Sequence, residues 1–110
     1  MKETSLARTT TTLLQALRDP RQETAWREFD GRYRPVLESV GRHMGLSHPD
    51  AEEVAQETLV QFVRDYQRGL YQRDKGRLRV WIQGILRHRA LDVLRRRSQA
   101  QDARGDSVLR

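Results

Sequence analysis

The stretch that decides the fold is residues 47–66, SHPDAEEVAQETLVQFVRDY. Apolar side chains recur in it every three or four residues, which places them on one face of an α-helix. Ser47 stands three residues before Asp50, as in a helix N-cap, and acidic residues in the first turn favour the positive end of the helix dipole. The sequence therefore predicts an amphipathic helix with this buried stripe: Ala51, Val54, Ala55, Thr58, Leu59, Phe62 and Tyr66.

Two further helices are expected before this one. Residues 13–18 form a short amphipathic stretch that ends at Asp19-Pro20-Arg21-Gln22, where a capping aspartate, a proline at the first helical position and a capping-box glutamine open the next helix. That second helix runs to about Gly45. Pro35 lies inside it and predicts a kink rather than a break, because the apolar pattern continues in register on both sides.

After the central helix we expect a polar loop over residues 68–76 and a last helix over residues 77–97, followed by a frayed tail from Ser98. Strand signals are missing, so the fold class is all-α, a compact bundle of three to four helices. The expected organisation is an N-terminal extension at 1–9, one domain at 10–100 and a flexible tail at 101–110. The expected shared core is Tyr33, Leu37, Leu59, Phe62, Ile82 and Ile85.

The composition argues against an enzyme, a metal site and a membrane protein. There is no cysteine, no catalytic motif and no metal spacing among His43, His48 and His88, so no cofactor or metal is expected. No apolar run is long enough for a membrane span, and the first residues lack the apolar core of a secretory signal. We therefore expect a cytoplasmic, non-enzymatic protein.

Charge is divided unequally along the chain. Residues 1–63 carry a net charge of −2 and residues 64–110 a net charge of +8. Such a split predicts an acidic surface for a protein partner and a basic surface for phosphate. In the basic half, arginines surround Trp81, with Tyr71 just before, and aromatic rings among arginines suit unstacked bases. Each feature also has an interpretation without nucleic acid. Trp81 can pack in the core, and the arginines near the end of the last helix can be a solvated helix end that complements the helix dipole.

Several motifs together resemble region 2 of bacterial extracytoplasmic-function (ECF) sigma factors of the sigma-70 family. Each motif is weak alone, but their order and spacing are specific, and the resemblance covers roughly residues 10–100. The residues that carry it are Ala25-Trp26, Phe29, Tyr33 and Pro35, then residues 50–59 (DAEEVAQETL), then Arg79-Val80-Trp81-Ile82, Ile85, Leu91-Asp92 and Arg95-Arg96.

The resemblance implies a transcription initiation module that binds core RNA polymerase and opens the promoter −10 element. Its implied partners are the clamp helices of the polymerase β′ subunit, the non-template strand of the −10 element and an anti-sigma factor. By position, the polymerase-binding residues would be Glu53, Gln56, Glu57 and Gln61. The DNA-binding residues would be Arg68, Tyr71, Arg73, Lys75, Arg77, Arg79, Trp81, Arg87, His88 and Arg95.

The chain departs from the family pattern in two places. His88 stands where the family usually has asparagine, four residues before Asp92. Nothing after Arg97 resembles region 4, the helix-turn-helix that reads the −35 element in a complete sigma factor. Two rival functions also remain: a stand-alone helical regulator that binds duplex DNA without polymerase, and a purely protein-binding helical adaptor.

Overall fold

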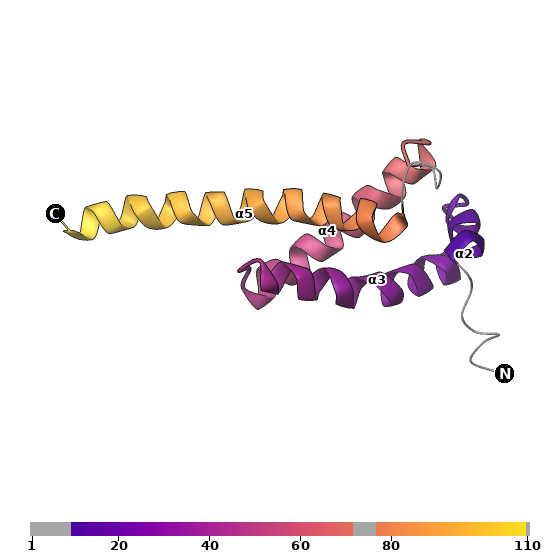
Figure 1. Ribbon diagram of the computed structural model, residues 1–110, viewed down its shortest axis with the longest axis horizontal. Helices are drawn as coiled ribbons and strands as arrows, with labels where there is room; N and C mark the ends of the chain where they lie inside the picture. Colours follow the sequence, from indigo (N-terminus) through magenta and orange to yellow (C-terminus); the bar gives the residue numbers. More distant parts are fainter. Residues whose placement is uncertain (1–9, 72–76, 110) are drawn as a thin grey trace.

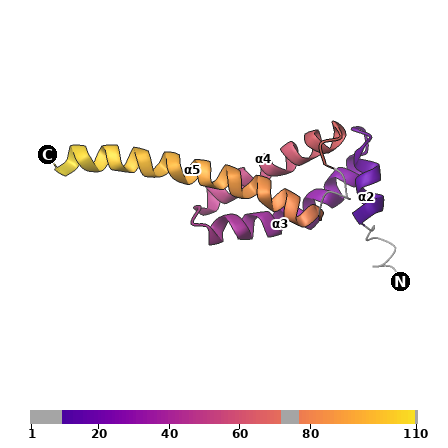
Figure 2. The ribbon, with the colours of Figure 1, turned by 45° about the horizontal axis from the view of Figure 1, so that its top comes forward.

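The computed structural model describes residues 10–71 and 77–109, with side chains over 11–71 and 77–102. In these residues the chain forms four helices and no strand: α2 (Thr10–Leu17), α3 (Glu23–His43), α4 (His48–Gln67) and α5 (Leu78–Leu109). Helices α3 and α4 pack on each other, α5 packs against both, and α2 lies at the start of α3 (Figures 1 and 2). The all-α class is confirmed.

Helix α4 is the centre of the bundle, as its sequence predicts. Ser47 is its N-cap, and the Ser47 hydroxyl accepts a hydrogen bond from the Asp50 backbone N–H at 3.2 Å. Gly45, with φ +110°, ends the preceding helix in a conformation that favours glycine. All seven residues of the predicted stripe are buried, so this helix and its buried face are confirmed: Ala51, Val54, Ala55, Thr58, Leu59, Phe62 and Tyr66.

The core is built around a run of contacting aromatic rings. Phe62 of α4 is fully buried, and its ring centroid lies 5.4 Å from that of Phe29 and 5.5 Å from that of Tyr71. Of the six residues expected to form a shared core, five are buried, and Ile85 is partly buried against them. The predicted core between the second, third and last helices is confirmed.

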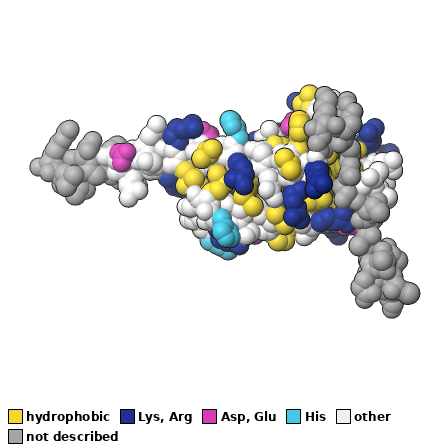
Figure 3. Space-filling view, viewed as in Figure 1, with side chains coloured by type: hydrophobic (Ala, Val, Ile, Leu, Met, Phe, Trp, Pro, Cys, Tyr) yellow, Lys and Arg dark blue, Asp and Glu magenta, His cyan; other side chains and the backbone are white. Residues whose placement is uncertain are grey.

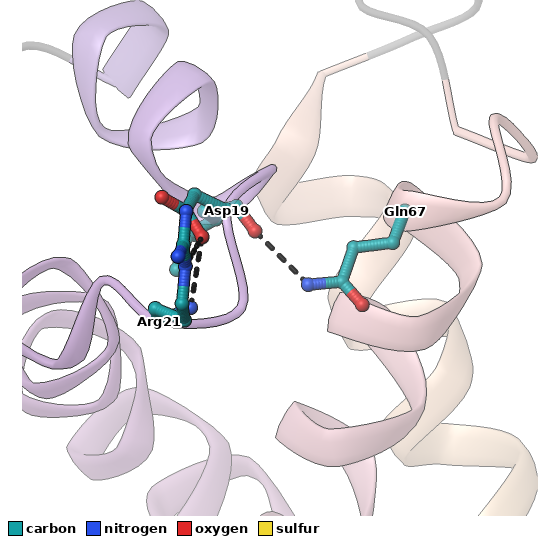
Figure 4. Close-up of polar contacts among 4 residues, drawn as sticks. Asp19, Arg21 and Gln67 are labelled. Atoms are coloured by element: carbon teal, nitrogen blue, oxygen red, sulfur yellow. Dashed lines mark hydrogen bonds and ion pairs between the residues drawn. The ribbon is translucent and has the colours of Figure 1, made fainter.

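The predicted start of the second helix is wrong. Residues 19–22 form a turn in which the Asp19 carboxylate accepts from the Arg21 backbone N–H at 3.0 Å (Figure 4). The Gln22 N–H donates to the Asp19 carbonyl. Aspartate followed by proline suits the first two positions of such a turn as well as it suits a helix cap. Helix α3 therefore begins only at Glu23, and Gln22 makes no side-chain cap. It then continues through Pro35 without a break, as expected.

The predicted end of the last helix is also wrong. Helix α5 does not stop at Arg97 but continues to Leu109, so its C-terminal turns extend past the other helices (Figure 1). Glutamine, alanine and arginine in residues 98–104 are good helix formers, and no proline interrupts them. The change to polar residues at Ser98 therefore marks where α5 stops packing against the other helices, and not where the helix ends.

Candidate functional site

The residues expected to meet polymerase lie together on the outer side of α4. Glu53, Gln56 and Glu57 are exposed, and Gln61 is partly exposed one turn further along. They occupy the face opposite the buried stripe, because they fall between the apolar positions of the helical period. We call Glu53, Gln56, Glu57 and Gln61 the α4 row.

Arginines from the two neighbouring helices hold the α4 row. Arg34 of α3 donates to the Gln56 side-chain oxygen and is itself held by Asp30 through contacts of 2.9 and 2.6 Å. Arg89 of α5 donates from Nε to the Gln61 oxygen at 2.8 Å and from its terminal nitrogen to the Glu57 carboxylate at 3.2 Å. Neither of these contacts was predicted from the sequence, in which Arg89 is one of the arginines around Trp81.

A third arginine fixes the N-terminus of α4 to α5. Arg97 contacts both oxygens of the Asp50 carboxylate, at 3.0 and 2.7 Å, and the Asp50 side chain is only 12% exposed. Two-point arginine–carboxylate contacts are among the stronger hydrogen-bonded pairs. The hydrogen bonds from Arg97 hold the pKa of the Asp50 carboxyl below its ordinary value. Part of the basic charge of the C-terminal half is therefore paired with an acidic side chain of the same domain.

We expect this pair to make stability depend on acid pH. Because the pKa of Asp50 is lower in the folded chain, the pair contributes stability above the unfolded pKa of about 4 and loses it as pH falls through the folded pKa. Urea unfolding should show wild type more stable than Arg97→Gln near neutral pH, with the two free energies converging in acid. The Asp50 carboxyl should titrate at higher pH in Arg97→Gln by carbon NMR.

The control for this prediction is Arg95→Gln, because Arg95 pairs with Asp92 of its own helix at 3.6 Å, whereas the charges of Arg97 and Arg96 both lower the pKa of Asp50. A difference between wild type and Arg97→Gln that stays constant through the acid range would contradict the assignment.

Half of the expected DNA-binding residues lie on the outer side of α5 or just before it: Arg77, Trp81, Arg87, His88 and Arg95. Arg77, Arg87 and His88 are exposed, and Arg95 is 65% exposed beside Asp92. Figure 3 shows arginine and hydrophobic side chains interspersed over this helix, and Val80 and Leu91 are its exposed large hydrophobics. Arg77, Trp81, His88 and Arg95 recur at four- and seven-residue intervals, which places them along one line of the helix.

Other members of the expected set lie apart from this line. Arg79 is exposed at the start of α5, but it lies two residues from Arg77 and from Trp81 and therefore on another side of the helix. Arg68 is exposed just after α4. Arg73 and Lys75 lie outside the described residues.

Tyr71 does not present its ring to the surface as we expected. Its side chain is 2% exposed, and its ring centroid lies 5.3 Å from Trp81 and 5.5 Å from Phe62. A large aromatic ring beside a polar loop gains more from burial against other rings than from solvent exposure. Trp81 is partly buried above it, and its indole N–H is buried without a hydrogen-bond partner among the described residues. Trp81 is therefore the ring of this pair that reaches the surface.

Neither a metal site nor a membrane span emerges from the described residues. No group of three or more histidine, cysteine or acidic side chains gathers there in a way that could hold a metal ion. In the same part of the chain, no helix has both the length and the apolar character needed to cross a membrane.

Comparison with known proteins gives one match. A family model described as Sigma-70 region 2 matches residues 29–100, which include all of α4 and most of α3 and of the packed part of α5. No curated protein and no solved structure matches the chain.

Proposed function

Because the chain belongs to the sigma-70 region 2 family, we propose that it is the region 2 module of an ECF sigma factor. In this proposal the α4 row binds the clamp helices of the RNA polymerase β′ subunit. The exposed side of α5 captures the non-template strand of the promoter −10 element. The module works in the cytoplasm, catalyses no reaction itself and is open to control by an anti-sigma factor.

The observation that carries the proposal is the separation of two chemically different surfaces on one small domain. The α4 row offers carboxylates and amides, with the Glu57 side chain 45% exposed. The outer side of α5 offers Arg77, Arg87 and Arg95 with the partly exposed Trp81. Acidic and amide groups suit a basic protein partner, whereas arginines beside an aromatic ring suit phosphates and an unstacked base.

The composition of α5 favours a single strand over a duplex. A recognition helix in the major groove presents a row of polar side chains, arginine among them, that reach base edges along one exposed face. The outer face of α5 instead carries Val80, Gly84, Arg87 and Leu91 at helical spacing. Large apolar and arginine side chains suit bases that have left the stack and the phosphates between them.

We therefore expect the chain to bind a single-stranded −10 oligonucleotide more tightly than the same sequence as a duplex. The affinity should fall as salt rises, since arginine–phosphate contacts release counterions. Arg79→Gln and Arg87→Gln should each lower the affinity for every sequence tested. The measurement is fluorescence anisotropy with labelled oligonucleotides, with the chain alone and with core polymerase.

Equal or stronger duplex binding in both settings would contradict strand capture. That result would favour the stand-alone regulator that reads duplex DNA. Absence of any salt-dependent nucleic-acid binding, with or without polymerase, would favour the protein-binding adaptor.

A further inference from the structure

Arg89 has a position that the charge pattern of the chain does not suggest. It belongs to the basic helix α5, yet it points to α4 rather than to the outer arginine surface. Its guanidinium spans two side chains one helical turn apart, Glu57 and Gln61, with donor–acceptor distances of 3.2 and 2.8 Å. One arginine therefore fixes the conformation of half of the α4 row.

The contacts of Arg89 leave one polar atom of each partner available. Arg89 uses Oε1 of Glu57 and Oε1 of Gln61. Among the residues described, Oε2 of Glu57 and Nε2 of Gln61 have no hydrogen-bond partner. An acceptor and a donor are thus held beside each other on a surface groove of about 460 Å³, which Gln56, Val60 and Arg64 also line.

A contribution to folding stability alone explains the Arg89–Glu57 ion pair poorly. The Arg89 side chain is 36% exposed and that of Glu57 45% exposed, and ion pairs at such exposure contribute little to folding. Glutamate and glutamine side chains populate many rotamers, however, and binding that immobilises them loses conformational entropy, which weakens the affinity. A guanidinium that already restricts both side chains reduces that loss.

We propose that Arg89 is a positioning residue of the polymerase-binding surface, which holds Glu57 and Gln61 in the conformation that the partner meets. This inference rests on the proposed function of the α4 row. Arg89 does not contact the partner in this account, and its positive charge opposes a basic partner. The effect of position must therefore be separated from the effect of charge.

The test compares Arg89→Gln with Arg96→Gln in binding to a β′ clamp-helix fragment. Both variants of the full chain lose one positive charge from α5. Arg96 lines the neighbouring groove with Glu53 and Glu57, but among the described residues it forms an ion pair with Asp92 of its own helix and with no residue of α4. Affinities are measured by isothermal calorimetry at physiological salt, and folding is checked by circular dichroism.

We expect Arg89→Gln to bind on the order of fivefold more weakly than Arg96→Gln. In a Glu57→Ala, Gln61→Ala background the difference between the two arginine variants should vanish, because the side chains that Arg89 positions are gone. Arg89→Lys keeps the charge but cannot span both partners in the same way, so it should resemble Arg89→Gln. If Arg89→Gln unfolds, Arg89→Lys is compared with Arg96→Lys, because both of these variants keep the positive charge.

The possible outcomes distinguish a failure of this inference from a failure of the proposed polymerase contact. Wild-type chain that fails to bind the fragment overturns the proposed polymerase contact and the inference with it. Wild-type binding with equal affinities for Arg89→Gln and Arg96→Gln overturns the inference alone. Tighter binding by Arg89→Gln than by Arg96→Gln also overturns it, because Arg89 would then compete with the partner.

Discussion

Replacing Phe62 with alanine is expected to destabilise the domain by about 3–5 kcal/mol. Phe62 has no exposed surface, and its ring contacts those of Phe29, Tyr66 and Tyr71, so the deletion removes the centre of the aromatic core. Domains of this size have little stability to lose, and much of the population should unfold at room temperature. Thermal and urea unfolding followed by circular dichroism measure the effect.

Leu91→Ala is the matched control for Phe62→Ala. Leu91 is also a large hydrophobic residue in a helix of the bundle, but it is 52% exposed on the outer side of α5. Its truncation should change the free energy of unfolding by less than about 1 kcal/mol. A Phe62→Ala variant as stable as Leu91→Ala would show that the packing around Phe62 is wrong.

Reversing the charge of Glu57 should abolish most of the affinity for the β′ clamp fragment. Glu57→Lys sets a positive charge against a basic partner and beside Arg89, and a reversal at a well-desolvated contact costs on the order of several kcal/mol. The helix should survive, because Glu57 lies outside the buried stripe. Calorimetric titration with the fragment measures the affinity, and circular dichroism checks that the variant is folded.

Glu23→Lys provides the matched reversal for this experiment. Glu23 is 81% exposed at the start of α3 and lies outside the residues that match the family. Its reversal changes net charge by the same amount and should leave the affinity near wild type. If folded Glu57→Lys also binds like wild type, the polymerase contact does not run through this part of α4.

The parts of the fold that could be predicted are those in which local signals agree. For α4, the Ser47 cap, the acidic first turn and the apolar period all indicate the same helix, and the structure agrees with each of them. At Asp19-Pro20 the same two residues suit a helix cap and a turn, so only the packing of the neighbouring helices decides between them. Gln67 of α4, which donates to the Leu17 carbonyl at 3.1 Å, is one such distant contact (Figure 4).

The candidate site was less predictable because its contacts join residues far apart in the sequence. The residues of the α4 row were expected from the family resemblance, but their links to Arg34 and Arg89 depend on how three helices pack. One signal was available for Arg89: it lies three and seven residues after the core positions Leu86 and Ile82, hence on the packed side of its helix. The burial of Tyr71 had no such local signal, because its neighbours come from other parts of the chain.

The crossing of α3 and α4 has a consequence for which sequences this fold can accept. At Gly41 a methyl group would lie 3.2 Å from Leu46 Cδ1 and 3.4 Å from the Ala51 methyl, so the two helices approach closely there. Close approach leaves these positions little tolerance for added volume, whereas no atom of the described residues lies within 4 Å of a methyl group placed at Gly31 or Gly84. Substitution should therefore be permissive at Gly31 and Gly84 and restricted at Gly41 and Ala51, although all four are small residues in helices.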